Sequence, residues 1–207
     1  MARDDSHYYE PAEGSRLPHD PFNAIVGPRP IGWISSISPS GTRNLAPYSF
    51  FNAFNYTPPL IGFSSIGWKD TAANIEATGE FVWNLATKDL SEAMNATSAG
   101  LPSNTDEFAY SGLTPVPARR VQAARVLESP VNLECRLTQL VQLESADRQP
   151  IQTWLVIGEV VAVHIDRHML VDGVYDTAAA HPILRAGGPG NYAEVRPDSI
   201  FTMPRPE

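Results

Sequence analysis

The stretch at residues 30–52, PIGWISSISPSGTRNLAPYSFFN, decides the fold that we expect for this chain. Its first nine residues, 30–38, are rich in isoleucine and serine, and PSGT follows them at 39–42. Proline, serine and glycine together are typical of a tight turn between two strands. The chain then returns through residues 43–52, so the stretch predicts a β-hairpin.

Further strands follow this hairpin. Residues 58–66, PPLIGFSSI, predict a strand whose two prolines stand at its start, where a missing N–H group does least harm. Residues 80–87, EFVWNLAT, predict another strand. Between them we expect a short helix that is capped by Asp70 or Thr71 and ended by Gly79, because glycine adopts the left-handed backbone conformation of a helix end.

The next segment contains a second helix and a long connection. Residues 89–100 have the end signals of a helix, with Asp89 as the N-cap and Gly100 as the stop. Residues 101–120 are expected to form a long connection with a helical turn at 104–112.

The clearest alternation of apolar and polar residues is at 131–138. One face carries Val131, Leu133, Cys135 and Leu137, and the other carries Asn132, Glu134, Arg136 and Thr138. Residues 155–165 alternate in the same way, so the two segments predict a late hairpin of long strands. Cys135 lies on the apolar face, which favours a buried structural thiol over a nucleophile.

Strands therefore dominate, without the regular strand and helix alternation of a Rossmann sheet. We expect a mainly β fold, an antiparallel barrel with short helices packed on its rim, because closure removes exposed sheet edges. The 207 residues suit one domain. Residues 1–21 are expected to form an N-terminal arm, and residues 22–207 the domain, which ends in a glycine- and proline-rich closing loop.

Composition excludes several classes of partner. The net charge of −8 and the scattered arginines argue against nucleic acid and against an anionic membrane surface. No apolar run reaches the roughly 18–20 residues of a membrane helix, and the N-terminus lacks a signal peptide. A single cysteine excludes an intrachain disulfide and a cysteine zinc site. We therefore expect a soluble, cytoplasmic protein.

Hydrolytic and metal chemistry have little support. No Gly-x-Ser-x-Gly motif occurs in the chain. His164 and His168 would lie about 13 Å apart on an extended chain, so surface histidines are favoured over a metal site. We expect no bound metal.

The segment SSIGWKDTAAN, residues 64–74, has two interpretations. A helix N-terminus presents free N–H groups and partial positive charge, which suits a phosphate, and Lys69 adds a full charge beside it. The Thr71 hydroxyl and the serines Ser64 and Ser65 are further donors at the same corner. The alternative is an ordinary helix start with an exposed lysine.

The segment NLAPYSFFNAFNYTPP, residues 44–59, mixes five aromatic residues with small polar ones. Backbone amides and hydroxyls beside aromatic walls suit a flat heteroaromatic ligand. The alternative is that the aromatic side chains fill one end of a barrel.

Together these motifs resemble the flavin reductase-like, FMN-binding split-barrel family, which includes flavoredoxins. The resemblance rests on RPIGWISSISPSGTRNLAPYSFFN, KDTAANIEATGEFVWNLAT, ESPVNLECRL, IGEVVAVHI and HPILRAGGPGNY. It implies a Greek-key split β-barrel that forms a homodimer, with FMN near the subunit interface. In this interpretation Ala46, Pro47, Tyr48 and Ser49 line the isoalloxazine ring, and Ser49, Ser64, Lys69 and Thr71 hold the ribityl phosphate. Further candidates for cofactor binding are Asn52, Ser65, Asp70, Asn74, Arg185 and Tyr192.

The resemblance also implies a reaction. NAD(P)H would reduce FMN, and the electrons would pass to free flavin, a metal chelate, a small electrophile or a partner oxygenase. The flavin carries this chemistry, so no catalytic side chain is expected. The alternatives are an FMN-binding electron carrier without its own turnover, and a barrel that binds another phosphorylated heteroaromatic ligand.

Overall fold

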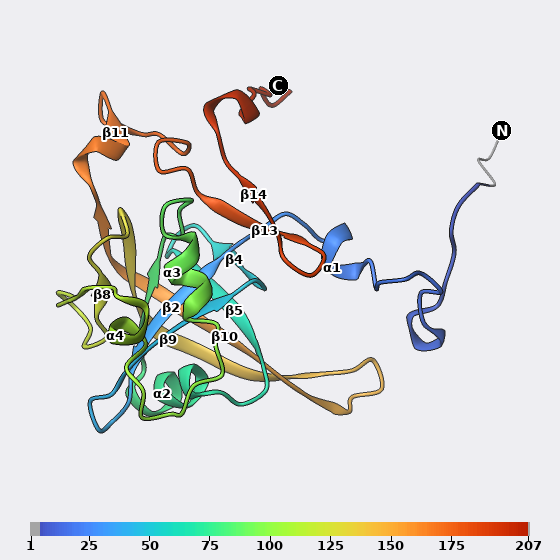
Figure 1. The fold of residues 1–207 in the computed structure, drawn as a ribbon, viewed down its shortest axis with the longest axis horizontal. Helices are drawn as coiled ribbons and strands as arrows, with labels where there is room; N and C mark the ends of the chain where they lie inside the picture. Colours follow the sequence, from blue (N-terminus) through green and yellow to red (C-terminus); the bar gives the residue numbers. More distant parts are fainter. Residues whose placement is uncertain (1–4, 207) are drawn as a thin grey trace.

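The computed structural model describes residues 5–206 and shows a curled antiparallel sheet with short helices around it (Figure 1). Seven strands form the sheet in the order β3-β2-β6-β9-β10-β5-β4, and every neighbouring pair is antiparallel. Their bounds are Gly32–Ile37 for β2, Arg43–Tyr48 for β3, Phe51–Asn55 for β4, Leu60–Ile66 for β5, Glu80–Asn84 for β6, Val131–Glu144 for β9 and Pro150–Ile165 for β10. The predicted mainly β split barrel with short helices is confirmed.

The strands that follow one another at the start of the sheet explain why the sheet curls. Strands β2 and β3 pair from Gly32 opposite Tyr48 to Ile37 opposite Arg43, as predicted. Strands β3 and β4 are the two outermost strands of the sheet, yet only residues 49 and 50 separate them in the chain. The two edges must therefore lie close together, which requires the sheet to curl into an open barrel.

The late hairpin is longer than the alternating segments predicted. Strand β9 runs through Val131–Glu144 and β10 through Pro150–Ile165, and the hairpin extends well beyond the barrel (Figure 1). The pairing shifts register at three places, between Pro150 and Trp154 and twice further along the hairpin. Such irregularities increase twist and bending, which lets these long strands follow the curvature of the barrel.

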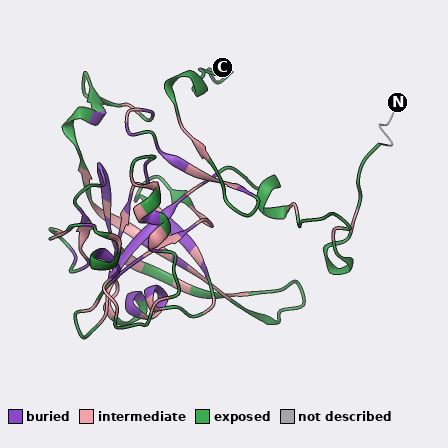
Figure 2. Cartoon of the chain, viewed as in Figure 1, coloured by how far each residue is buried: buried purple, intermediate pink, exposed green. Residues whose placement is uncertain are grey.

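The core lies on both faces of strand β2, whose residues 32–36 are all buried (Figure 2). Ile34 belongs to the cluster inside the barrel, together with Phe63 and Phe81. Its neighbour Trp33 points to the opposite face and joins a second cluster that the helices cover. Successive residues of a strand point to opposite faces, so one strand contributes to both clusters. The second cluster also contains Leu45, Met94, Phe108 and Val126.

Residues 5–206 contain four short helices: α1 at Phe22–Ile25, α2 at Asp70–Thr78, α3 at Ser91–Ala96 and α4 at Glu107–Ser111. Gly79 ends α2 in the left-handed conformation, as expected, and α4 is the predicted helical turn. The expected caps are wrong, however. The N-cap position of α2 is Lys69 and that of α3 is Leu90, and neither donates or accepts a side-chain capping bond.

The predicted helix at 89–100 is also shorter in the structure, where it ends at Ala96. Thr97 follows it, and its hydroxyl donates to the carbonyl oxygen of Met94 and accepts from the indole nitrogen of Trp33 at 3.0 Å. This bond to a core tryptophan holds Thr97 at the end of the helix, so the chain leaves α3 before Gly100.

Smaller sheets complete the fold. The expected closing loop contains a strand pair, because β13 at Ile183–Gly187 pairs with β14 at Asn191–Glu194 and with β1 at Arg29–Pro30. The remaining pairs are β7 at Pro115–Val116 with β8 at Arg125–Val126, and β11 at Leu170–Val171 with β12 at Val174–Tyr175. The described part of the chain also contains three short 3-10 helices, at Pro11–Glu13, Arg167–Met169 and Pro197–Ser199.

The N-terminal segment extends away from the barrel (Figure 1). Its base is held by Arg29, which donates to the carbonyl oxygens of Asn23, Val26 and Ser49. Residues 1–4 of the expected arm lie outside the described part of the chain. Among residues 5–206, no helix has the length and apolar character needed to cross a membrane.

Candidate functional site

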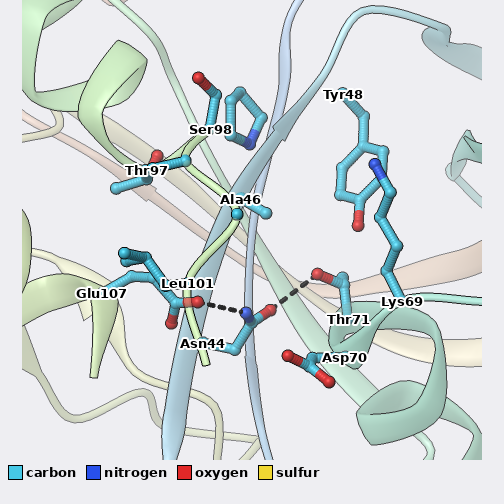
Figure 3. Close-up of a pocket in the computed structure, with 13 residues that line it drawn as sticks. Asn44, Ala46, Tyr48, Lys69, Asp70, Thr71, Thr97, Ser98, Leu101 and Glu107 are labelled. Carbon is cyan, nitrogen blue, oxygen red and sulfur yellow. Dashed lines mark hydrogen bonds between the residues drawn. The ribbon is translucent and has the colours of Figure 1, made fainter. Parts of the chain in front are cut away.

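The main candidate site is a cavity of about 440 Å³ between strand β3, the start of α2 and the segment that follows α3 (Figure 3). Four parts of the chain line it: residues 44–48, 69–71, 97–101 and Glu107. The lining residues are Asn44, Ala46, Pro47, Tyr48, Lys69, Asp70, Thr71, Thr97, Ser98, Ala99, Gly100, Leu101 and Glu107. The structure thus brings together six predicted residues: Ala46, Pro47, Tyr48, Lys69, Asp70 and Thr71.

The hydroxyl of Tyr48 is a buried polar atom of this wall. It is the only buried side-chain nitrogen or oxygen atom without a hydrogen-bond partner among residues 5–206. The hydroxyls of Thr71 and Ser65 face it, but neither forms a hydrogen bond of good geometry with it. Burial raises the pKa of Tyr48, and these two hydroxyls offset part of the rise. A buried hydroxyl without a partner is costly, so this one fits a ligand that completes it.

The first turn of α2 forms the second part of the wall. No side chain caps this helix, so its first N–H groups have no side-chain acceptor, and they carry the partial positive charge of a helix N-terminus. Lys69 adds a full positive charge at the cavity and is exposed. The free N–H groups and the Lys69 charge match the phosphate interpretation of residues 64–74. The Thr71 hydroxyl does not match it, because it donates to Asn44.

The Thr71 hydroxyl donates to the side-chain oxygen of Asn44 at 2.7 Å. The amide nitrogen of Asn44 in turn donates to a carboxylate oxygen of Glu107 at 2.9 Å, and both bonds are visible in Figure 3. The other carboxylate oxygen of Glu107 accepts the backbone N–H of Leu45 at 3.3 Å. Burial raises the pKa of Glu107, and the charge of Asp70 acts in the same direction.

Seven of the thirteen predicted residues lie outside the cavity. Ser65 is buried and donates to the carbonyl oxygen of Gly67, and Asn74 donates to the hydroxyl of Ser36 behind the cavity wall. Ser36 bonds Asn44, so Asn74 contacts the site only through this network. Ser49 lies between β3 and β4, Asn52 lies in β4 and Ser64 lies in β5. None of these three residues lines the cavity.

Arg185 and Tyr192 are not brought into the cavity either. They line a neighbouring hollow of about 610 Å³, which shares Ser98 with the main cavity. The guanidinium of Arg185 lies over the Tyr192 ring, 5.1 Å from its centroid. It also donates to the carbonyl oxygens of three residues of its own loop: Gly187, Gly188 and Asn191. Its contacts therefore hold the β13–β14 turn.

Asn44, Glu107 and the segment 97–101 also belong to the site, although they are not among the residues predicted from the sequence. Asn44 lies within the quoted aromatic stretch, next to predicted residues, so its position was a usable signal. Glu107 is 63 residues away from it and begins a five-residue helix. Nothing in its local sequence distinguishes it from a surface acid.

The remaining groups with chemical potential have structural contacts. Cys135 is fully buried, and burial raises its pKa, with the charge of Glu134 acting in the same direction. His164 contacts the Glu134 carboxylate at 2.5 Å. Within residues 5–206, no three histidine, cysteine, aspartate or glutamate side chains are grouped closely enough to hold a metal.

Comparison with known proteins identifies the family. The model of the flavin reductase-like domain matches residues 27–183 of this chain. The chain belongs to the flavin reductase-like family. An uncharacterised protein from Halalkalibacterium halodurans is 36% identical over 196 residues, which cover 89% of this chain and 90% of that protein.

Two solved structures are similar over most of this flavin reductase-like chain. Nitrilotriacetate monooxygenase component B from Bacillus cereus is 31% identical with a TM-score of 0.84, covering 95% of this chain and 98% of that one. The 2-nitrobenzoate 2-nitroreductase of Pseudomonas fluorescens is 28% identical with a TM-score of 0.78, covering 88% of each chain.

Proposed function

We propose that this protein is an FMN-dependent oxidoreductase of the flavin reductase type, which takes electrons from NAD(P)H. The observation that carries the proposal is the cavity wall formed by Tyr48, Lys69 and the uncapped first turn of α2. A cavity of about 440 Å³ is in the range that small-molecule cofactors occupy. Its donors and its positive charge fit the phosphate end of FMN.

The residues have distinct tasks in this proposal. Lys69 and the N–H groups at the start of α2 hold the phosphate, and the Tyr48 hydroxyl gains the partner that it lacks. Ala46 and Pro47 provide the surface on which the ring lies. When bound, FMN supplies the redox chemistry. Direct hydride transfer from a nicotinamide needs two positioned rings and no acid–base pair of side chains.

The family and the two solved neighbours support an oxidoreductase role. A monooxygenase component B favours a partner oxygenase as the electron acceptor, and a nitroreductase favours a small electrophile such as a nitroaromatic compound. We propose the partner oxygenase first, because this chain covers 98% of the component B chain.

We also propose that the protein is a homodimer. Ile66 is 61% exposed and Trp68 is 42% exposed, although both are large apolar residues. Trp68 packs edge-on against Trp154 of the neighbouring strand, with ring centroids 5.2 Å apart. Exposed apolar surface of this kind marks an interaction site, and we propose a second copy of the chain as its occupant, as the family resemblance implies.

The function is tested by titrating the purified protein with FMN and following flavin fluorescence and absorbance. We expect FMN to bind, and NADH or NADPH to bleach the bound flavin without oxygen. Reduction by dithionite alone would favour an electron carrier. A protein that binds no FMN would exclude both functions.

The phosphate contact has its own test. The variant Lys69→Ala should bind FMN about 10- to 100-fold more weakly, because a charge-assisted hydrogen bond contributes about 1.5–3 kcal/mol. Riboflavin lacks the phosphate, so its affinity should hardly change. Equal losses for the two flavins would contradict a phosphate role for Lys69.

A further inference from the structure

We propose that Glu107 takes up a proton when a phosphate-bearing ligand enters the cavity, and that its protonation state reverses the hydrogen bonds along the cavity wall. This inference rests on the proposed function, since it requires a phosphate beside the start of α2. It assigns Glu107 as a positioning residue, which acts on the ligand through Asn44 and Thr71.

The direction of the network follows from the chemistry of Glu107. An ionised carboxylate only accepts hydrogen bonds, so Asn44 must turn its NH₂ group toward Glu107. The side-chain oxygen of Asn44 then faces the other way, where it accepts from Thr71 at 2.7 Å and from Ser36 at 3.2 Å. Asn74 extends the same chain by donating to Ser36 at 3.2 Å. Every bond in the network therefore points toward Glu107.

This direction makes the Thr71 hydroxyl unsuitable for a phosphate. Thr71 has one hydroxyl proton, and it is given to Asn44. The oxygen atom that remains can only accept, and the oxygens of a phosphate dianion also only accept. With Glu107 ionised, Thr71 and the ligand therefore offer each other no proton.

Protonation of Glu107 removes this conflict. A neutral carboxyl group donates its O–H to the side-chain oxygen of Asn44, once the amide has turned over. The NH₂ group of Asn44 then faces Thr71 and Ser36, whose oxygens accept it, and the Ser36 hydroxyl donates to the side-chain oxygen of Asn74 once that amide turns over too. The Thr71 proton becomes free to point into the cavity and to donate to the ligand.

The charges around the cavity act in the same direction. The 97–101 segment contributes no charged side chain, and the Tyr48 hydroxyl is neutral at physiological pH. Arg43 and Asp106 pair with each other at 2.9 Å. This leaves Lys69 as one cation against the two carboxylates of Asp70 and Glu107. A phosphate dianion would add two negative charges, and protonation of Glu107 removes one.

Burial already raises the pKa of Glu107 in the free protein, so less is needed to protonate it when the ligand binds. The sign of the pH dependence follows. FMN affinity should fall as pH rises through the pKa of Glu107, approaching about tenfold per pH unit where binding takes up one full proton. Riboflavin brings no phosphate charge, so its affinity should not follow this dependence.

The experiment is isothermal titration calorimetry of FMN and riboflavin between pH 7 and 8.5, in buffers of different ionisation enthalpy. The phosphate of FMN stays almost fully dianionic in this range, because its second pKa is about 6. We expect the wild-type protein to take up more protons per FMN bound than Glu107→Gln does. At pH 8.5, Glu107→Gln should bind FMN several-fold more tightly than the wild-type protein.

Asp70→Asn is the matched control, because it removes the other cavity carboxylate and leaves the Glu107–Asn44–Thr71 bonds in place. It should bind FMN more tightly at every pH and still take up a proton, although at a lower pH than the wild-type protein does, because the charge of Asp70 helps to raise the pKa of Glu107. Equal proton uptake by the wild-type protein and Glu107→Gln would overturn the inference while leaving the proposed function intact. If Glu107→Gln keeps the uptake and Asp70→Asn loses it, the proton belongs to Asp70 and the inference is overturned. Absence of FMN binding by the wild-type protein would overturn both.

If Glu107→Gln does not fold, Thr71→Val replaces it as the test variant. It removes the hydroxyl that the network redirects, so the FMN affinity should fall at pH 7 and lose part of its pH dependence. An unchanged affinity and pH dependence in Thr71→Val would overturn the inference.

Discussion

At the scale of single residues, Gly158 shows how tightly the barrel interior is packed. It lies in β10, and a Cβ atom added there would stand 2.4 Å and 2.6 Å from two ring atoms of Phe81, which is fully buried. We expect Gly158→Ala to lower the free energy of unfolding by about 1–3 kcal/mol, because an overpacked core forces side chains and backbone to shift. Urea unfolding measures this loss.

Gly190→Ala is the control for this prediction. Gly190 has no atom within 4 Å of an added Cβ, and it needs no positive φ angle. Its substitution should change the free energy of unfolding by less than about 0.5 kcal/mol. Equal effects at the two glycines would contradict the packing argument.

Cys135 gives a second prediction at this scale. Its thiol is fully buried, and burial together with the charge of Glu134 raises its pKa, so little reactive thiolate forms. We expect the native protein to react with a disulfide reagent on the order of a hundredfold or more slowly than the urea-unfolded protein. Rapid native reaction would show that the strand opens or that the thiol is accessible.

Single residues of the site were predictable only where their chemistry is local. Lys69 and Thr71 stand beside a helix start, and Ala46 to Tyr48 lie in an aromatic stretch, so short-range patterns and the resemblance identify them. Glu107 enters the site through contacts with Asn44 and Leu45 across more than 60 residues. No local period or motif encodes such a contact.

At the scale of elements, Glu134 joins strand β9 to the β7–β8 loop. Its carboxylate accepts the backbone N–H groups of Arg119 at 2.8 Å and Arg120 at 2.6 Å, and contacts His164. Burial alone would raise the pKa of Glu134, but these hydrogen bonds together lower it. We expect Glu134→Gln to lose about 2–3 kcal/mol of unfolding free energy at pH 7, because charge-assisted bonds are lost.

The pH dependence of this loss has a definite sign. A carboxyl group whose pKa is lower in the folded protein stabilises the fold above its unfolded pKa, and this contribution disappears as pH falls through the folded value. The stability difference between the wild-type protein and Glu134→Gln should therefore shrink below about pH 4. Glu144→Gln, at an exposed position of the same strand, should show no such difference. A difference that is constant with pH would contradict the role of the charge.

Strand β9 shows why a strand is easier to predict than the burial of each of its faces. Alternation at 131–138 predicts the strand and its apolar face. The opposite face carries Asn132 and Glu134, which are 2% and 0% exposed because the β7–β8 segment covers them. Polar residues on a strand are read as facing solvent, whereas here they bind a loop through hydrogen bonds. The burial of that face depends on a tertiary contact.

At the scale of the whole molecule, the barrel itself follows from connectivity. Strands β3 and β4 are neighbours in the chain and lie at opposite edges of the sheet, so the sheet has to curl. The sequence predicts each of these strands but not their order in the sheet, because strand pairing over long separations has no local signal. The long hairpin β9–β10 then extends beyond the barrel and exposes apolar residues there, among them Val141 and Ile151, which are 43% and 41% exposed.

The apolar surface where β5 meets this hairpin bears on assembly. Ile66 ends β5 beside the Trp68–Trp154 pair, and its side chain is 61% exposed. We expect the wild-type protein to elute with the mass of a dimer, and Ile66→Arg to shift it toward a monomer, because a buried arginine without a partner opposes association. Val171→Arg, at a position that is 58% exposed on β11, is the control and should remain dimeric. Size-exclusion chromatography with light scattering measures the masses, and a monomeric wild-type protein would contradict the dimer and the role of this surface.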